Sequence, residues 1–239
     1  MKQLKSYLSC VLMLLFSANL SYAESSKDAF INIKKSALKK EYHHLAVAPL
    51  DAAADLKMPD SVKSMLEQEV VKRLKKEGFK VLSPQIMQDI RQQMNSLVGL
   101  AHQAGEEDPK KLAAVLDHSY RELLLRHKVD GIVSLRVRAV GAPFMNDKAE
   151  WDGASQKIAH KGDGLMKFIT GKSYGGTIAA STLKVSIWDR RETLLYSWGG
   201  GIEVLMQRNA KTLEQIPTSE FWQDEKRIKN SAKLALSPL

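Results

Sequence analysis

Short apolar runs alternate along this chain with longer stretches in which apolar residues recur every three to four positions. A short run bounded by turn residues predicts a buried strand, and the wider spacing predicts a helix with one apolar face. The runs that predict strands lie at residues 44–50, 79–83 and 132–140, and the stripes that predict helices lie at 62–74, 86–97 and 112–124. Strands that alternate with helices predict an α/β domain in which helices pack on a mixed sheet.

The ends of these helices carry their own signals. Asp60 and Ser61 are suited to cap the first helix, and Gly78 is suited to end it. The dipeptides Ser83-Pro84 and Asp108-Pro109 predict the starts of the second and third helices, because proline is favoured in the first helical turn. With 239 residues, of which 44% are hydrophobic, the chain can bury one sizeable core.

The second half of the chain predicts an antiparallel hairpin, an insertion before it and a helix after it. Residues 177–205 alternate apolar and polar side chains around a turn at 189–192. Gly199–Gly201 within the return strand predict a bulge or a close backbone approach. Residues 141–176, rich in glycine and aromatic residues, predict an insertion or long loop, and residues 219–236 predict a final helix. The expected sheet has about five strands.

The first 23 residues have the pattern of a secretory signal. Lys2 and Lys5 precede a short apolar run, and the segment ends at Ala23 after small residues that a signal peptidase accepts. The run is too short for a bilayer, which needs about 20 residues. Cys10 lies before most of the run, which argues against a lipid anchor. We therefore expect cleavage after Ala23 and a location in the periplasm or outside the cell; an uncleaved anchor is the alternative.

Residues 24–42 form a polar, lysine-rich leader ahead of the α/β domain. Disorder after the cleavage site is the first interpretation. The alternative is a short helix with Phe30, Ile33 and Ala37 on one side. The expected organisation is therefore a signal peptide at 1–23, a leader at 24–42 and a single domain at 43–239 that includes the insertion.

The charge of the chain restricts its partners. Its formal net charge is +9, and removal of the first 23 residues, which hold two lysines and no acid, lowers it to about +7. A basic envelope protein is drawn to anionic lipid, acidic glycan or an acidic partner, and the expected export argues against nucleic acid. A solvated, mildly basic surface is the alternative. Because Cys10 is the only cysteine, the exported chain would have no disulfide and no cysteine metal site.

Four segments of the sequence resemble the periplasmic α/β domain shared by the curli-secretion protein CsgG, the amino-terminal domain of TolB and the penicillin-binding-protein activator LpoB. The segments are Val47–Leu50, Gly78–Val81, Asp130–Val133 and Asp189–Leu195, and the resemblance covers about residues 43–140 and 177–236. It implies an anticodon-binding-domain-like fold and a scaffold, channel part or regulator of an envelope machine, without catalysis. Relatives of this kind can assemble into rings, so an oligomer is also implied.

Motifs for catalysis or cofactor binding are incomplete. Gly171-Lys172-Ser173 resembles the end of a phosphate-binding loop, but Met166 stands where that loop needs glycine. The acids at 106–108 are placed to complement a helix dipole. No G-x-S-x-G elbow is present. The histidines, none in a zinc-binding spacing, are His43, His44, His102, His118, His127 and His160. We therefore predict no enzyme activity, no cofactor and no metal.

Two groups of residues are candidates for an interaction surface. Aromatic side chains beside lysines are typical of interfaces and of the membrane boundary, although the same aromatics can instead pack over the sheet. That group comprises Trp151, Phe168, Tyr174, Lys161, Lys167 and Lys172. Arg136 and Arg138, together with Arg190-Arg191, are predicted to form a basic patch, for which a solvated sheet face is the alternative.

The sequence therefore predicts a non-catalytic, exported accessory protein that binds another envelope component, such as a protein of a secretion, assembly or cell-wall machine. The alternative is a periplasmic binding protein for a small ligand or for anionic lipid. A hydrolase with an unrecognised site is the third hypothesis, which a pocket of converging carboxylates or histidines would favour.

Overall fold

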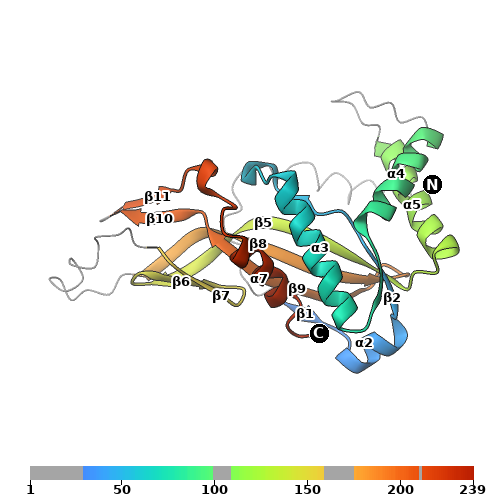
Figure 1. Cartoon of the computed structure of the whole chain (residues 1–239), viewed down its shortest axis with the longest axis horizontal. Coiled ribbons are helices and arrows are strands. Elements are labelled where there is room, and N and C mark those ends of the chain that lie inside the picture. Colours follow the sequence, from blue (N-terminus) through green and yellow to red (C-terminus); the bar gives the residue numbers. More distant parts are fainter. Residues whose placement is uncertain (1–28, 99–108, 159–174, 210–211) are drawn as a thin grey trace, which may run out of the picture.

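A computed structural model describes residues 29–98, 109–158, 175–209 and 212–239 (Figure 1). The predicted signal peptide, the first part of the leader and the acids at 106–108 lie outside the described residues. No described helix has both the length and the apolar character needed to cross a bilayer.

The fold is mixed α/β, as predicted, but its sheet is larger than the expected five strands. Nine strands form the main sheet, and a pair forms a second one. The main-sheet strands are β1 (Phe30–Ile31), β2 (His44–Val47), β3 (Asp51–Ala52), β4 (Lys80–Leu82), β5 (Gly131–Met145), β6 (Lys148–Trp151), β7 (Ala154–Lys157), β8 (Gly175–Asp189) and β9 (Leu194–Val204). The pair is β10 (Met206–Asn209) and β11 (Thr212–Gln215). The α-helices are α2 (Lys35–Glu41), α3 (Asp60–Lys76), α4 (Pro84–Val98), α5 (Pro109–Arg126) and α7 (Glu225–Ala235), and the short 3-10 turns are η2 (Ala54–Leu56) and η3 (Thr218–Glu220).

One end of the sheet is parallel and carries helices on both faces. Its strand order is β4-β2-β5, with β2 parallel to both neighbours. The connection from β2 to β4 runs through α3, which packs with Leu45 and Val133 on one face. The connection from β4 to β5 runs through α4 and α5, which pack with Ala46 and Ile132 on the opposite face. The connections that leave β2 and β4 therefore lie on opposite faces of the sheet.

The other end of the sheet is antiparallel and is built on two long strands. β5 and β8 are paired without interruption from Gly131 opposite Asp189 to Met145 opposite Gly175. β9 follows β8, which confirms the predicted hairpin. The boundaries of the predicted insertion at 141–176 are wrong: residues 141–145 continue β5, and residues 148–157 form the β6–β7 hairpin. β5 continues through Gly141 because β8 pairs with its backbone there. Residues 159–174 lie outside the described part.

The described part of the leader contains a strand and a helix, so the interpretation of these residues as disordered is wrong. β1 pairs with β9, and α2 buries Leu38, only 1% exposed, in the main core. The folded unit therefore includes residues 30–41, ahead of the expected boundary at 43. Burial of a leucine side chain stabilises by about 2 kcal/mol, which helps to hold a short polar segment in place. Phe30 and Ile33 do not share a helical face, since Phe30 lies on a strand.

The helical stripes match their predictions, and α4 and α5 begin at Pro84 and Pro109 as predicted. α3 buries Val62, Leu66, Val70 and Leu74, and Gly78 with a φ of 96° lets the chain turn after it. The predicted capping role of Asp60 and Ser61 is wrong, because Pro59 precedes the first turn and no side chain caps it. Leu97 is 77% exposed because the end of α4 projects beyond the sheet with α5 (Figure 1).

Three consecutive glycines in β9 are approached from both faces of the sheet. A β-carbon at Gly200 would overlap the Ser231 carbonyl oxygen of α7, and one at Gly201 would lie 2.6 Å from the Trp151 indole nitrogen. The ladder between β8 and β9 also shifts register beside these glycines, between Ala180 and Thr182. The predicted close approach is therefore confirmed. Tyr196, fully buried, adds a bond from its hydroxyl to the Ala235 carbonyl oxygen at 2.5 Å.

Gly200→Ala is expected to destabilise the protein by about 3 kcal/mol or more, because backbone atoms of α7 cannot move aside as a flexible side chain would. Gly175→Ala, in β8, is the matched control: its β-carbon would lie 3.5 Å from the nearest atom, and less than about 1 kcal/mol should be lost. Urea unfolding of both variants measures the difference. Equal stabilities would contradict the close packing of α7 on β9.

Candidate functional site

The aromatic and basic side chains predicted from residues 141–176 do not form an exposed site in the described part. Trp151 is 4% exposed, and its indole N–H donates to the Ser181 carbonyl oxygen at 3.0 Å. It packs with Val140, Ala142 and Val204. The interpretation of Trp151 as an exposed anchor is therefore wrong, since folding of the β6–β7 hairpin against the sheet buries it. Phe168, Tyr174, Lys161, Lys167 and Lys172 lie outside the described residues, as does the 171–173 motif.

The predicted arginine patch is divided between two places. Arg136 is exposed and pairs with Asp51 at 3.1 Å, and Arg138 lies two positions along the same face of β5. Arg190 lies beside the first residue of β5, where it bonds to Asp130 at 2.7 Å. Five strand positions, about 17 Å, separate these places. The prediction of a single basic patch that includes all these arginines is therefore wrong.

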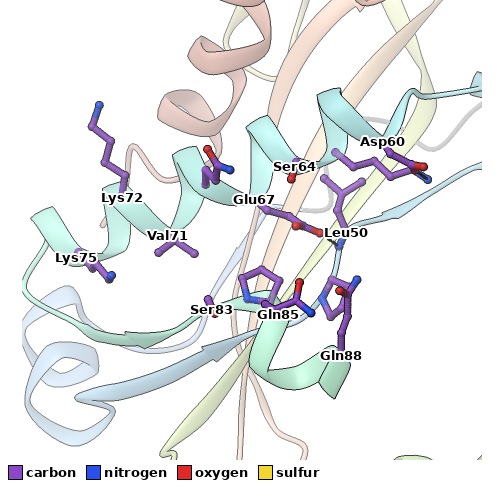
Figure 2. Close-up of a pocket in the computed structure, with 14 residues that line it drawn as sticks. Leu50, Asp60, Ser64, Glu67, Val71, Lys72, Lys75, Ser83, Gln85 and Gln88 are labelled. Atoms are coloured by element: carbon purple, nitrogen blue, oxygen red, sulfur yellow. Dashed lines mark hydrogen bonds and ion pairs between the residues drawn. The ribbon is translucent and has the colours of Figure 1, made fainter. Parts of the chain in front are cut away.

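The strongest candidate site is a groove between α3 and the residues that join β4 to α4. It encloses about 760 Å³. One wall is the exposed side of α3, and the other is formed by residues that follow β4 and begin α4, as Figure 2 shows. Leu50, which follows β2, lies at its base. In open parallel sheets, ligands bind at the carboxyl ends of strands where successive connections go to opposite faces, and this groove has that position.

The acids of the groove are already engaged, whereas two of its three lysines are more available. Glu67 of α3 accepts a hydrogen bond from the Leu50 amide at 2.7 Å, which ties the segment after β2 to the helix. Asp60 pairs with Lys63 at 2.9 Å. Lys72 is 4.0 Å from its nearest acid, and Lys75 has no ion-pair partner among the described residues. The end of the groove near the C-terminus of α3 is therefore basic.

The groove also borders an open strand edge. β4 is the terminal strand of the sheet, and its outer side has no neighbour in the part of the chain that the structure describes. The Lys80 amide donates to the His43 carbonyl oxygen at 2.9 Å, toward the sheet. Because alternate residues of a strand direct their backbone groups to opposite sides, the amide and carbonyl of Val81 face outward. An unpaired edge of this kind can accept another strand.

Sequence reasoning found the elements of this groove but not the groove itself. Its lining comes from three separate segments, and its position depends on where α3 and α4 lie relative to β2 and β4. The only signal in the sequence was the predicted order of strands and helices, which would locate a crevice once the strand order in the sheet is known.

Two titratable groups of the described residues with shifted pKa values are His44 and Glu203. Across residues 29–98, 109–158, 175–209 and 212–239, no three His, Cys, Asp or Glu side chains are grouped so that they could hold a metal ion. Burial lowers the pKa of His44, which favours its neutral form. Glu203 is a buried acid, but its carboxylate accepts the Trp222 amide at 2.9 Å. Trp222 has a φ of 65°, so this bond holds a strained turn before α7. Glu203 therefore has a structural role.

Glu203 should make stability depend on pH. Burial raises its pKa in the folded protein, so the folded state binds the proton more tightly than the unfolded state. The resulting contribution is fully present below about pH 4.5 and is lost as the pH rises through the folded pKa. We expect Glu203→Gln, which keeps an oxygen for the Trp222 amide, to lose less stability than the wild type between pH 4.5 and pH 7, by on the order of 1 kcal/mol. Urea unfolding of the two proteins at several pH values in this range measures their free energies of unfolding. Equal changes of this free energy with pH in both proteins would contradict a raised pKa of Glu203.

Comparisons with family models, curated proteins and solved structures found no match for this chain. The resemblance to the CsgG, TolB and LpoB domains therefore remains a prediction from the sequence.

Proposed function

We propose that this chain is a non-catalytic accessory protein of the cell envelope, and that an extended segment of a protein partner binds along β4 in the groove beside α3. The observation that carries this proposal is the open edge of β4 next to a groove of about 760 Å³. Main-chain pairing with an exposed strand supplies affinity, while pockets for alternate side chains supply specificity.

The dimensions of the groove suit a short extended segment. Its lining on α3 extends from Asp60 to Lys75, which at 1.5 Å per residue corresponds to about 22 Å. An extended chain covers this length with about six or seven residues. Val81 offers one outward amide and one outward carbonyl, and the polar side chains of Gln85 and Gln88 lie beyond it at the start of α4. The partner segment therefore needs few main-chain bonds from β4 and several from side chains.

The charge of the groove favours an acidic partner. Lys72 and Lys75 lie on the α3 side, and alternate residues of an added strand would face them. Acidic side chains at these positions would complement the two lysines, which favours recognition and faster association. A segment with acidic residues at every second position is therefore the expected ligand.

Location and family belong to the same proposal. The secretory pattern of residues 1–23 supports export to the periplasm, and the four segments that resemble CsgG, TolB and LpoB support an accessory role and an anticodon-binding-domain-like fold. The anionic-lipid alternative loses one of its residues, because Trp151 is buried and cannot face a membrane.

A photo-crosslinking side chain tests the groove. With the crosslinker at Gln88 of the full chain in intact cells, we expect one envelope protein to be captured, through a segment that contains acidic residues. The same crosslinker at Glu150, exposed on β6, is the control and should not capture that protein. Lys72→Glu combined with Lys75→Glu should reduce the yield at Gln88 by about tenfold, since two attractive contacts become repulsive.

Three results would contradict this proposal. Equal capture from Gln88 and Glu150 would show that the contact lies elsewhere. An unchanged yield in the double charge-reversal variant would show that the captured segment is not recognised through acidic residues. Capture of a second copy of this chain alone would replace the partner with an oligomer.

A further inference from the structure

A second, largely apolar pocket lies on the antiparallel half of the sheet. We propose that it binds a small amphiphilic molecule with a single apolar chain and a neutral or cationic head. The pocket encloses about 540 Å³ and shares no lining residue with the α3 groove. The inference therefore goes beyond the proposed function and does not depend on it.

The pocket exists because side chains become small along one face of the two long strands. Val133, Leu135 and Val137 of β5 fill the core, and the next residues on that face are Ala139 and Gly141. On β8, Ala179 lies directly opposite Gly141. Small residues at adjacent positions leave space above the sheet that the larger side chains of the core would have filled.

The walls of the pocket are apolar. They are formed by Leu56 of η2, Leu205 and Met206 at the junction of β9 and β10, and Phe221 before α7. In Figure 1, β10 and β11 lie on the opposite side of the β5–β8 ribbon from β6 and β7. Segments that are distant in the sequence therefore meet over Ala139, Gly141 and Ala179.

Hydrogen bonds fix the positions of these walls. The indole N–H of Trp222 donates to the Leu56 carbonyl oxygen at 3.2 Å, and the Trp222 amide is held by Glu203. The ring of Phe221 packs edge-on against Trp222, with 6.3 Å between ring centroids. The Leu205 amide bonds to the Ala179 carbonyl oxygen at 2.8 Å. Because both walls are fixed to the backbone, the cavity is already formed before a ligand enters, which reduces the entropic cost of binding.

The size and lining of the pocket indicate the ligand. Pockets for small molecules enclose about 300–1,000 Å³ and are mostly apolar, with a few polar groups that fix orientation. An apolar cavity of about 150 Å³ binds benzene, so this pocket has room for a molecule roughly three times larger. A saturated chain of about ten to twelve carbons falls within that range.

The polar groups of the lining select the head. Asp55 is the one charged side chain among the described residues that line the pocket, and it is exposed. Thr177 and Gln215, also exposed, can donate and accept hydrogen bonds. A carboxylate or phosphate head would be repelled by Asp55, whereas an ammonium or hydroxyl head would be accepted.

Fluorescence of N-phenyl-1-naphthylamine, a neutral apolar probe, tests the pocket in the full exported chain. We expect fluorescence to rise on binding and dodecylammonium or glycerol monolaurate to displace the probe, with laurate weaker than dodecylammonium by about fivefold or more. Ala139→Leu should weaken probe binding by about tenfold, because its larger side chain occupies the space. Ala54→Leu, exposed and outside the lining, is the matched control and should bind as the wild type does.

Asp55→Lys keeps the inference testable if Ala139→Leu does not fold, since Asp55 is exposed and its replacement leaves the core intact. This variant should reverse the preference, so that laurate displaces the probe better than dodecylammonium does. Unchanged probe binding in folded Ala139→Leu would overturn the site, as would no fluorescence change in the wild type. Equal displacement by laurate and dodecylammonium in both the wild type and Asp55→Lys would overturn the proposed selection of the head.

Discussion

The close approach of α7 and the β6–β7 hairpin to three glycines of β9 is the constraint on which the rest of the structure depends. Gly200 lets the backbone of α7 lie against the strand, and Gly201 accepts the indole of Trp151 on the other face. The Gly201 amide, at the edge of the sheet, donates to the Asp152 carbonyl oxygen at 3.1 Å. The three glycines therefore let α7 pack on one face of β9 and let the β6–β7 hairpin cover the other face. The hairpin also bonds to an edge of the strand that would otherwise be open.

The two ends of the sheet present different surfaces. Near the antiparallel end, the turn before α7 is held by Glu203 and contacts Leu56, which sets the walls of the apolar pocket. At the parallel end, α3 packs on β2, and no described strand pairs with the outer side of β4. The same domain thus presents a preformed cavity and an unpaired strand edge, which are suited to a small amphiphile and to an extended peptide.

A binding protein needs few of the features that an enzyme needs. Among the residues described, the acids near the groove are bonded to lysines or to the backbone, and Glu203 holds a turn. The groups left for recognition are Lys72 and Lys75, the outward backbone of Val81, and Asp55 at the pocket. In the two proposals, each of these groups would act through charge or hydrogen bonding at a fixed place.

Local pattern in the sequence determined the helices α3, α4, α5 and α7 and the strands β2, β4, β5, β8 and β9. The stripe of Val62, Leu66, Val70 and Leu74 predicted α3, and Gly199–Gly201 predicted a close approach, because periodicity and glycine report directly on burial and backbone space. Tertiary structure alone decided that Trp151 is buried, that Leu38 joins the core, and that β4 ends the sheet beside a groove. These outcomes depend on which distant segments meet, and an aromatic or leucine has the same local signature whether a partner covers it or not.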